Sequence, residues 1–96
     1  MSLSFEWSYA KAVSNLAKHA VSFEEASTVF ADRLSATIHD PLHSSETEDR
    51  FITVGQSNRN RLLVVVHCDR DSSIRVISAR QATRRERRVY ENSKEG

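Results

Sequence analysis

The sequence predicts an α+β domain with two N-terminal helices, then an antiparallel β meander of three to four strands, then a C-terminal helix. Two observations lead to this prediction. Apolar residues recur at helical spacing over residues 9–30, whereas residues 34–79 carry apolar runs of strand length separated by turn signals. The helices are expected to pack against one face of the sheet. The 96 residues suffice for one domain, 1–96, and residues 1–3 and 95–96 are expected to be added ends outside its fold.

The first helix is predicted over residues 9–18, with Ser8 as its N-cap. Before it, Phe5 and Trp7 alternate with polar residues and indicate either a short edge strand or a lead-in segment. The expected core stripe of this helix recurs at helical spacing: Ala10, Val13, Leu16, Ala17 and Ala20. Another face of the same helix carries a polar row: Lys11, Asn15 and Lys18.

A second helix is predicted over residues 23–30, because residues 22–25 read as a capping box. In that box the Ser22 hydroxyl accepts a hydrogen bond from the Glu25 N–H, while the Glu25 carboxylate reaches back to the start of the helix. The corner between the two helices places Lys18 and His19 near an exposed helix end.

The strands are predicted from alternation and from turn signals, over residues 34–39, 50–56, 61–68 and 74–79. Residues 62–66 are apolar on both faces and therefore mark a central strand. Asp40 and Pro41 form a turn signal, followed by a polar loop. A second capping box, at Thr83 and Glu86, opens a terminal helix that is expected to end near Asn92.

Charge divides the chain into an acidic first part and a basic second part. Residues 1–58 hold four basic and eight acidic residues, and residues 59–96 hold ten basic and five acidic, so the net charges are −4 and +5. Nine of those ten are arginines, whose planar guanidinium suits phosphate, so the pattern points toward a nucleic-acid partner, with a solvated charged face as the open alternative. With one cysteine, Cys68, no signal peptide and no membrane-spanning stretch, we expect a cytoplasmic protein without membrane contact.

Three sequence blocks occur in order along the chain. The first joins Phe5, Trp7, Lys11 and Asn15 to KHAVSFEEA at 18–26; the second is DPLHS at 40–44 with EDRFITVG at 48–55; the third is ISARQATRRERRVY at 77–90. Together they resemble the BrnT toxin family of type II toxin–antitoxin systems over about ninety residues. Two positions depart from the family pattern. Ser8 replaces a preferred Asp, and Ala20 replaces a Gly. A glycine at the end of a helix adopts the left-handed conformation without strain, whereas an alanine adopts it at a free-energy cost of about 1 kcal/mol.

The resemblance implies a RelE-like fold and a metal-independent endoribonuclease that blocks translation. It also implies neutralisation by a DNA-binding antitoxin of the BrnA kind, in a complex that binds operator DNA. No cofactor is implied. The sequence itself offers no metal-ligand pattern, because Pro41 interrupts the spacing of His39 and His43.

Metal-free RNA cleavage needs a base for the 2′-hydroxyl, cations for the phosphorane and an acid for the leaving oxygen. His19 and His67 are the acid–base candidates, with a helix-end cation and a core histidine as the respective alternatives. Lys18 could activate the leaving group, and Glu48 could serve as a base or orient Arg50. Arg50 and Arg80 are the expected phosphate contacts, because antiparallel neighbours could bring their strand ends together; salt bridges to Glu48 or Glu86 are the alternative. These catalytic candidates require one concavity that gathers Lys18, His19, Arg50, His67 and Arg80.

Other basic residues are predicted to bind RNA outside the catalytic centre: Lys11, Arg61, Arg84, Arg85, Arg87 and Arg88. Two rival functions stay open. A basic module could bind nucleic acid or a protein partner without cutting. The other rival, an antitoxin-like regulator, is disfavoured because no helix-turn-helix or ribbon pattern stands out. Separately, His43, which the second sequence block carries, could be functional or a turn residue.

Overall fold

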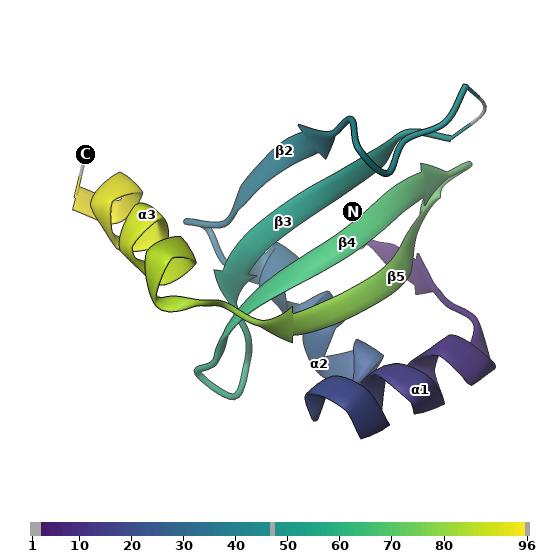
Figure 1. Cartoon of the computed structure of the whole chain (residues 1–96), viewed down its shortest axis with the longest axis horizontal. Helices are drawn as coiled ribbons and strands as arrows, with labels where there is room; N and C mark the ends of the chain where they lie inside the picture. The colour runs from purple at the N-terminus through teal and green to yellow at the C-terminus, as the bar shows by residue number, and fades with distance from the viewer. Residues whose placement is uncertain (1–2, 47, 96) are drawn as a thin grey trace.

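Five strands form one mixed sheet in the computed structural model, which describes residues 3–46 and 48–95. The spatial order is β1-β5-β4-β3-β2 (Figure 1). The four later strands are antiparallel neighbours, as the predicted meander requires, whereas β1 lies parallel to β5 at one edge. The strand bounds are β1 Ser4–Glu6, β2 Ala36–Asp40, β3 Arg50–Gln56, β4 Leu62–Arg70 and β5 Ser73–Gln81.

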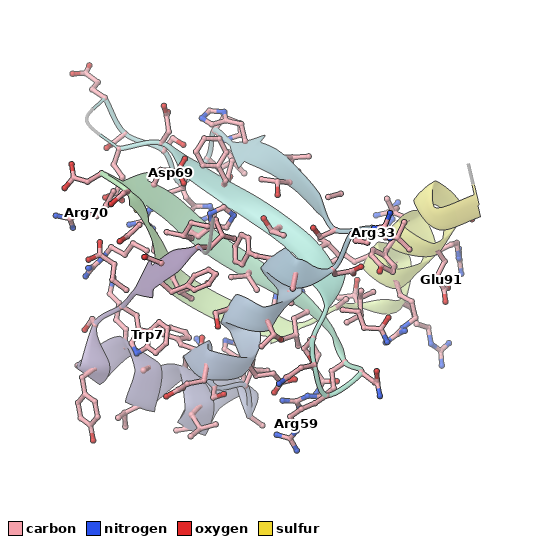
Figure 2. The ribbon with its side chains drawn as sticks, turned by 180° about the vertical axis from the view of Figure 1, so that it is seen from behind. Trp7, Arg33, Arg59, Asp69, Arg70 and Glu91 are labelled. Carbon is pink, nitrogen blue, oxygen red and sulfur yellow. The ribbon has the colours of Figure 1, made fainter. Side chains whose placement is uncertain are left out.

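The helices lie on both faces of this sheet, which corrects the expectation that one face carries them all. The helices α1 (Tyr9–His19) and α2 (Phe23–Ser27) and the 3-10 turn η1 (Thr28–Ala31) cover the face seen in Figure 2. The last helix, α3 (Arg84–Glu95), contributes Val89 and Tyr90 to a cavity with strand residues of the opposite face. We call the face under α1 and α2 the covered face, and the opposite one, which carries Ile38, Val54 and Val64, the open face.

The hydrophobic core lies between the covered face and α2. Val21, Phe23, Ala26 and Val29 pack against four strand residues and are fully buried. The strand residues of this core are Leu63, Val65, Val76 and Ala79. Because strand side chains alternate between faces, the neighbouring residues of the same strands project onto the open face. The covered face therefore supports the fold and leaves the open face for other roles.

The face of α1 that meets the sheet is not the predicted apolar stripe. Val13 and Leu16 are 50% and 52% exposed, whereas Asn15, from the predicted polar row, is buried. The amide of Asn15 donates to the carbonyls of Val21 and Ala79, both at 2.9 Å, and accepts from the Ala79 N–H at 3.1 Å. One polar side chain thus closes the edge of β5 that lies beyond its pairing with β1, a tertiary role that helical periodicity does not reveal.

The predicted caps depend on local contacts and are mostly confirmed. Ser8 and Ser22 accept the N–H groups of Lys11 and Glu25 at 3.3 and 3.0 Å. Thr83 and Glu86 form a reciprocal capping box, with distances of 2.8 and 3.2 Å. The Glu25 carboxylate, however, does not return to Ser22.

Three strands begin or end one or two residues from their predicted bounds, and two helix boundaries differ more clearly. The second helix divides after residue 27 into α2 and η1, and the terminal helix extends to residue 95 rather than ending near residue 92. Ala20 does adopt the left-handed conformation expected at the end of α1, with φ of 58°. Alanine therefore takes the turn that glycine would enter without strain.

Candidate active site

A carboxylate–histidine pair lies where β2 ends. His43 Nδ1 is 2.6 Å from Asp40 Oδ2, and the other oxygen of Asp40 accepts the Leu42 N–H at 3.2 Å. The Asp40 side chain is 7% exposed, whereas that of His43 is 64% exposed. The hydrogen bond to His43 holds the pKa of Asp40 below its usual value. A buried carboxylate therefore orients an accessible imidazole, an arrangement suited to proton transfer.

Arg50 lies beside this pair, directly opposite Asp40 in the register of β2 and β3. Its Nε donates to Glu48 Oε1 at 3.1 Å, and its backbone N–H donates to the Ser44 hydroxyl at 2.9 Å. Opposite residues on paired strands have Cβ atoms about 5 Å apart. Arg50, oriented through Nε by Glu48, thus starts from a backbone position next to the Asp40–His43 pair.

Arg75 completes the cluster from β5, and the sequence reasoning missed it. It pairs with Cys68 of β4, on the far side of β4 from Arg50. Burial raises the pKa of the Cys68 thiol and Glu48 raises it further, whereas the charges of Arg75 and Arg50 act in the opposite direction. All three charged groups are therefore close to the same sulfur. We call Asp40, His43, Glu48, Arg50 and Arg75 the polar end of the open face.

A β-bulge places Arg75 in this cluster. The pairing of β4 with β5 shifts by one residue between Val66 and His67. Without the shift, Arg75 would lie opposite Asp69 and project toward the covered face, because a one-residue slip exchanges the two faces of a strand.

Arg80 lies at the other end of the open face. Its two Nη groups each donate to one oxygen of Glu86 at 2.8 Å, and this contact lowers the pKa of Glu86 to about 2. Arg80 pairs with Val64 of β4, which in turn pairs with Val54 of β3. Val54 lies four residues along β3 from Arg50. That offset is roughly 13 Å. The expected meeting of the Arg50 and Arg80 strand ends is therefore wrong, and the alternative of salt bridges to Glu48 and Glu86 is confirmed.

His67 lies inside the molecule, on the covered face. Its Nε2 is 2.7 Å from the Thr53 hydroxyl, and its ring contacts Phe30 and Phe51 at centroid distances of 4.8 and 6.0 Å. Only 4% of His67 is exposed, its Nδ1 has no partner among the described residues, and burial lowers its pKa. The His67 ring is therefore almost fully enclosed by the fold.

The basic residues of α1 occupy a third region. Lys11, Lys18 and His19 line a hollow of about 280 Å³ between α1 and β5. Both lysines are exposed, and His19 is half-buried. The five residues expected around one concavity therefore lie in separate parts of the molecule, and the catalytic hypothesis fails in that form.

Arg61, predicted to bind RNA, is engaged within the fold. It forms an ion pair with the buried carboxylate of Glu25 through Nε and Nη2, and it donates to the Ala20 carbonyl at 3.1 Å. The first of these contacts lowers the pKa of Glu25. The guanidinium thus closes the C-terminal end of α1. By contrast, the four arginines predicted on the last helix are exposed: Arg84, Arg85, Arg87 and Arg88.

Two negative findings concern the described part of the chain. It contains no group of three His, Cys, Asp or Glu residues placed to hold a metal ion. It also contains no helix that is long and apolar enough to span a membrane.

Comparison with known proteins agrees with the sequence resemblance. Residues 7–86 match the family described as the ribonuclease toxin BrnT of type II toxin–antitoxin systems. The crystal structure of the Brucella abortus ribonuclease toxin BrnT superimposes with a TM-score of 0.62 at 22% identity, covering 86% of this chain and all of the other. Among curated proteins, none matches the sequence significantly.

Proposed function

Because the chain belongs to the BrnT family of ribonuclease toxins, we propose that it is an endoribonuclease whose active site is the polar end of the open face. The observation that carries this assignment is the pairing of Asp40 with the exposed His43 directly beside Arg50. It supplies a proton-transfer group and a cation at one accessible place, which His67 and Arg80 do not.

In the proposed reaction, His43 accepts the proton of a ribose 2′-hydroxyl through its exposed ring edge. The 2′-oxygen then forms a bond to phosphorus while the bond from phosphorus to the 5′-oxygen breaks. The protonated His43 returns its proton to the leaving 5′-oxygen, so the step yields a cyclic phosphate and a free 5′-hydroxyl. Asp40 is a positioning residue that fixes the ring through its hydrogen bond to Nδ1.

Arg50 and Arg75 bind the scissile phosphate. Neighbouring strands lie about 4.8 Å apart, so the two arginines, with β4 between them, start about 10 Å from each other. Their side chains are long enough to converge on one phosphate and to stabilise the charge of the phosphorane. Glu48 positions Arg50 through its hydrogen bond to Nε. Because arginines supply the positive charge, the proposed reaction is metal-independent.

The remaining assignments are part of the same proposal. RNA cleavage would inhibit translation in the cytoplasm, and a DNA-binding antitoxin of the BrnA kind would neutralise the protein. Lys18 and His19, with Lys11, are proposed to hold RNA at the hollow beside α1, where they are accessible. The exposed arginines of α3 are proposed to attract RNA electrostatically.

The test is cleavage of a defined single-stranded RNA by the purified protein in EDTA. His43→Gln should reduce the cleavage rate by about 10²-fold or more, and Arg50→Gln and Arg75→Gln by about 10²–10³-fold each. The control is Arg59→Gln, because Figure 2 places Arg59 at the opposite end of the sheet from Asp69 and Arg70. This control should cut at the unchanged rate.

Two results would contradict the proposal. Cleavage that survives in His43→Gln and Arg50→Gln but disappears in Lys18→Gln would move the active site to α1. RNA binding without cleavage at any protein concentration would favour the non-catalytic basic module, in which the salt-bridged Arg50 and Arg80 serve the fold alone.

A further inference from the structure

An apolar groove lies on the open face beyond the polar end, between the strands and α3. Its cavity measures about 340 Å³. Its floor is aliphatic: Ala36, Ile38, Ile52, Val54 and Val64. Val89 of α3 forms the opposite wall, and both Val89 and Ile38 are 63% exposed. A cluster of exposed aliphatic side chains on one concave surface is typical of a protein-binding site.

The rim of this groove is basic. Arg80 and Glu86 neutralise each other, so the charge in the groove's lining comes from Arg85. Around the same helix, Arg84, Arg87 and Arg88 are also exposed, against one exposed carboxylate among its described side chains, Glu91. Arg33 lies outside the groove's lining but near α3, as Figure 2 shows, and the Tyr90 hydroxyl binds the adjacent Asp32. An occupant of complementary charge is therefore acidic.

We propose that this groove docks an acidic, amphipathic segment of the antitoxin, whose apolar side chains enter between Ile38 and Val89 while its carboxylates meet the arginine rim. The antitoxin as partner rests on the proposed function; the chemistry of the segment rests on the groove. Because the polar end shares the open face with the groove, a segment bound here also lies across the surface that RNA must approach.

The two other occupants fit the groove less well. Single-stranded RNA binds through phosphate contacts and through stacking of its bases on aromatic rings, but the floor is aliphatic and the hydroxyl of Tyr90, the aromatic residue among the groove's lining, is bonded to Asp32. A second copy of the chain in a two-fold contact would place one arginine rim against the other.

The test uses a synthetic 18-residue helical peptide with leucine along one face and glutamate elsewhere, and a matched peptide with lysine in place of glutamate. Binding is followed by NMR of the isoleucine, leucine and valine methyl groups of the full chain. The acidic peptide should shift Ile38, Val54 and Val89 and bind at least tenfold more tightly than the basic peptide. Ile38→Asp and Val89→Asp should each weaken its binding at least tenfold.

The matched control is Val13→Asp, an exposed valine on α1 that is 50% accessible and lies on the other side of the sheet. This variant should bind the acidic peptide as the unchanged chain does. Shifts that centre on Val13, equal affinity for both peptides, or larger groove shifts with a single-stranded RNA oligonucleotide would each overturn the docking proposal. Cleavage assays on the same preparations keep the two proposals apart, because Ile38→Asp and Val89→Asp should still cut RNA.

Discussion

Replacing Asn15 with alanine should remove a large part of the stability of this fold. The Asn15 amide satisfies one buried N–H and two buried carbonyls that belong to Ala79 and Val21. Each buried polar group left without a partner costs about 1–3 kcal/mol, so the loss of three contacts should cost at least about 3 kcal/mol. Since small domains are stable by about 5–15 kcal/mol, the variant should be close to its folding limit.

Urea unfolding followed by far-UV circular dichroism measures this loss directly, and thermal melting provides a second measure. A destabilisation of 3 kcal/mol should lower the Tm by about 12 °C or more in a domain of this length. Ser14→Ala, an exposed neighbour on α1, is the control and should change the free energy of unfolding by less than about 0.5 kcal/mol.

Asn15→Asp separates hydrogen bonding from side-chain size. One carboxylate oxygen can still accept the Ala79 N–H, but the other would face two carbonyl oxygens unless it is protonated. The folded state should therefore raise the pKa of this carboxyl above its unfolded value, and stability should be lost as the pH rises through the folded pKa. A loss below 1 kcal/mol in Asn15→Ala, or an Asn15→Asp variant that is equally stable at pH 4 and pH 7, would refute the bridging role.

Three other predictions concern packing and pH. Gly55→Ala should cost about 1–3 kcal/mol by urea unfolding, because the added Cβ would meet the Cβ of Ser35 at 2.9 Å; unchanged stability would show that the strand moves away. Burial lowers the pKa of His67, so the unfolded state binds its proton first and the urea midpoint should fall as the pH drops below about 6.5; His67→Phe should weaken that slope, and an unaltered slope would place its origin elsewhere. The contact with Arg80 lowers the pKa of Glu86 to about 2, so its stabilisation is present above the unfolded pKa of about 4.3 and is lost toward pH 2. Glu86→Gln should therefore lose less stability than the unchanged chain between pH 5 and pH 2, and parallel pH curves would contradict this.

Features that depend on neighbouring residues could be predicted from the sequence, whereas features that depend on the register could not. The caps at Ser8, Ser22 and Thr83 and the span of β3 follow from local chemistry, and the structure contains them. Arg75 is different. Regular alternation places it with Ala79 on the covered face, and only the bulge in the β4–β5 pairing turns it toward the open face. A bulge between two apolar strands leaves no distinct sequence signal in this chain.

The exposure of the apolar stripe of α1, with Asn15 buried in its place, has a related cause. A helical stripe identifies an apolar face but does not say which face the tertiary structure covers. Here the edge of β5 beyond its pairing with β1 needs hydrogen-bond partners, and Asn15 supplies them at a position where Val13 or Leu16 could not. The need to pair the backbone groups of β5 therefore sets which face of α1 meets the sheet, and the apolar stripe faces solvent.

Two histidines show how their surroundings, rather than the residue type, separate a structural role from a chemical one. His67 is flanked by Phe30 and Phe51, and burial favours its neutral form, so it cannot both take up a proton readily and meet a phosphate. His43 has a buried carboxylate on one ring nitrogen, which fixes the ring, and most of the ring is open to solvent. The comparison makes one consequence measurable. If His43 transfers the proton in RNA cleavage, cleavage of a defined RNA should be lost in His43→Gln and persist in His67→Phe.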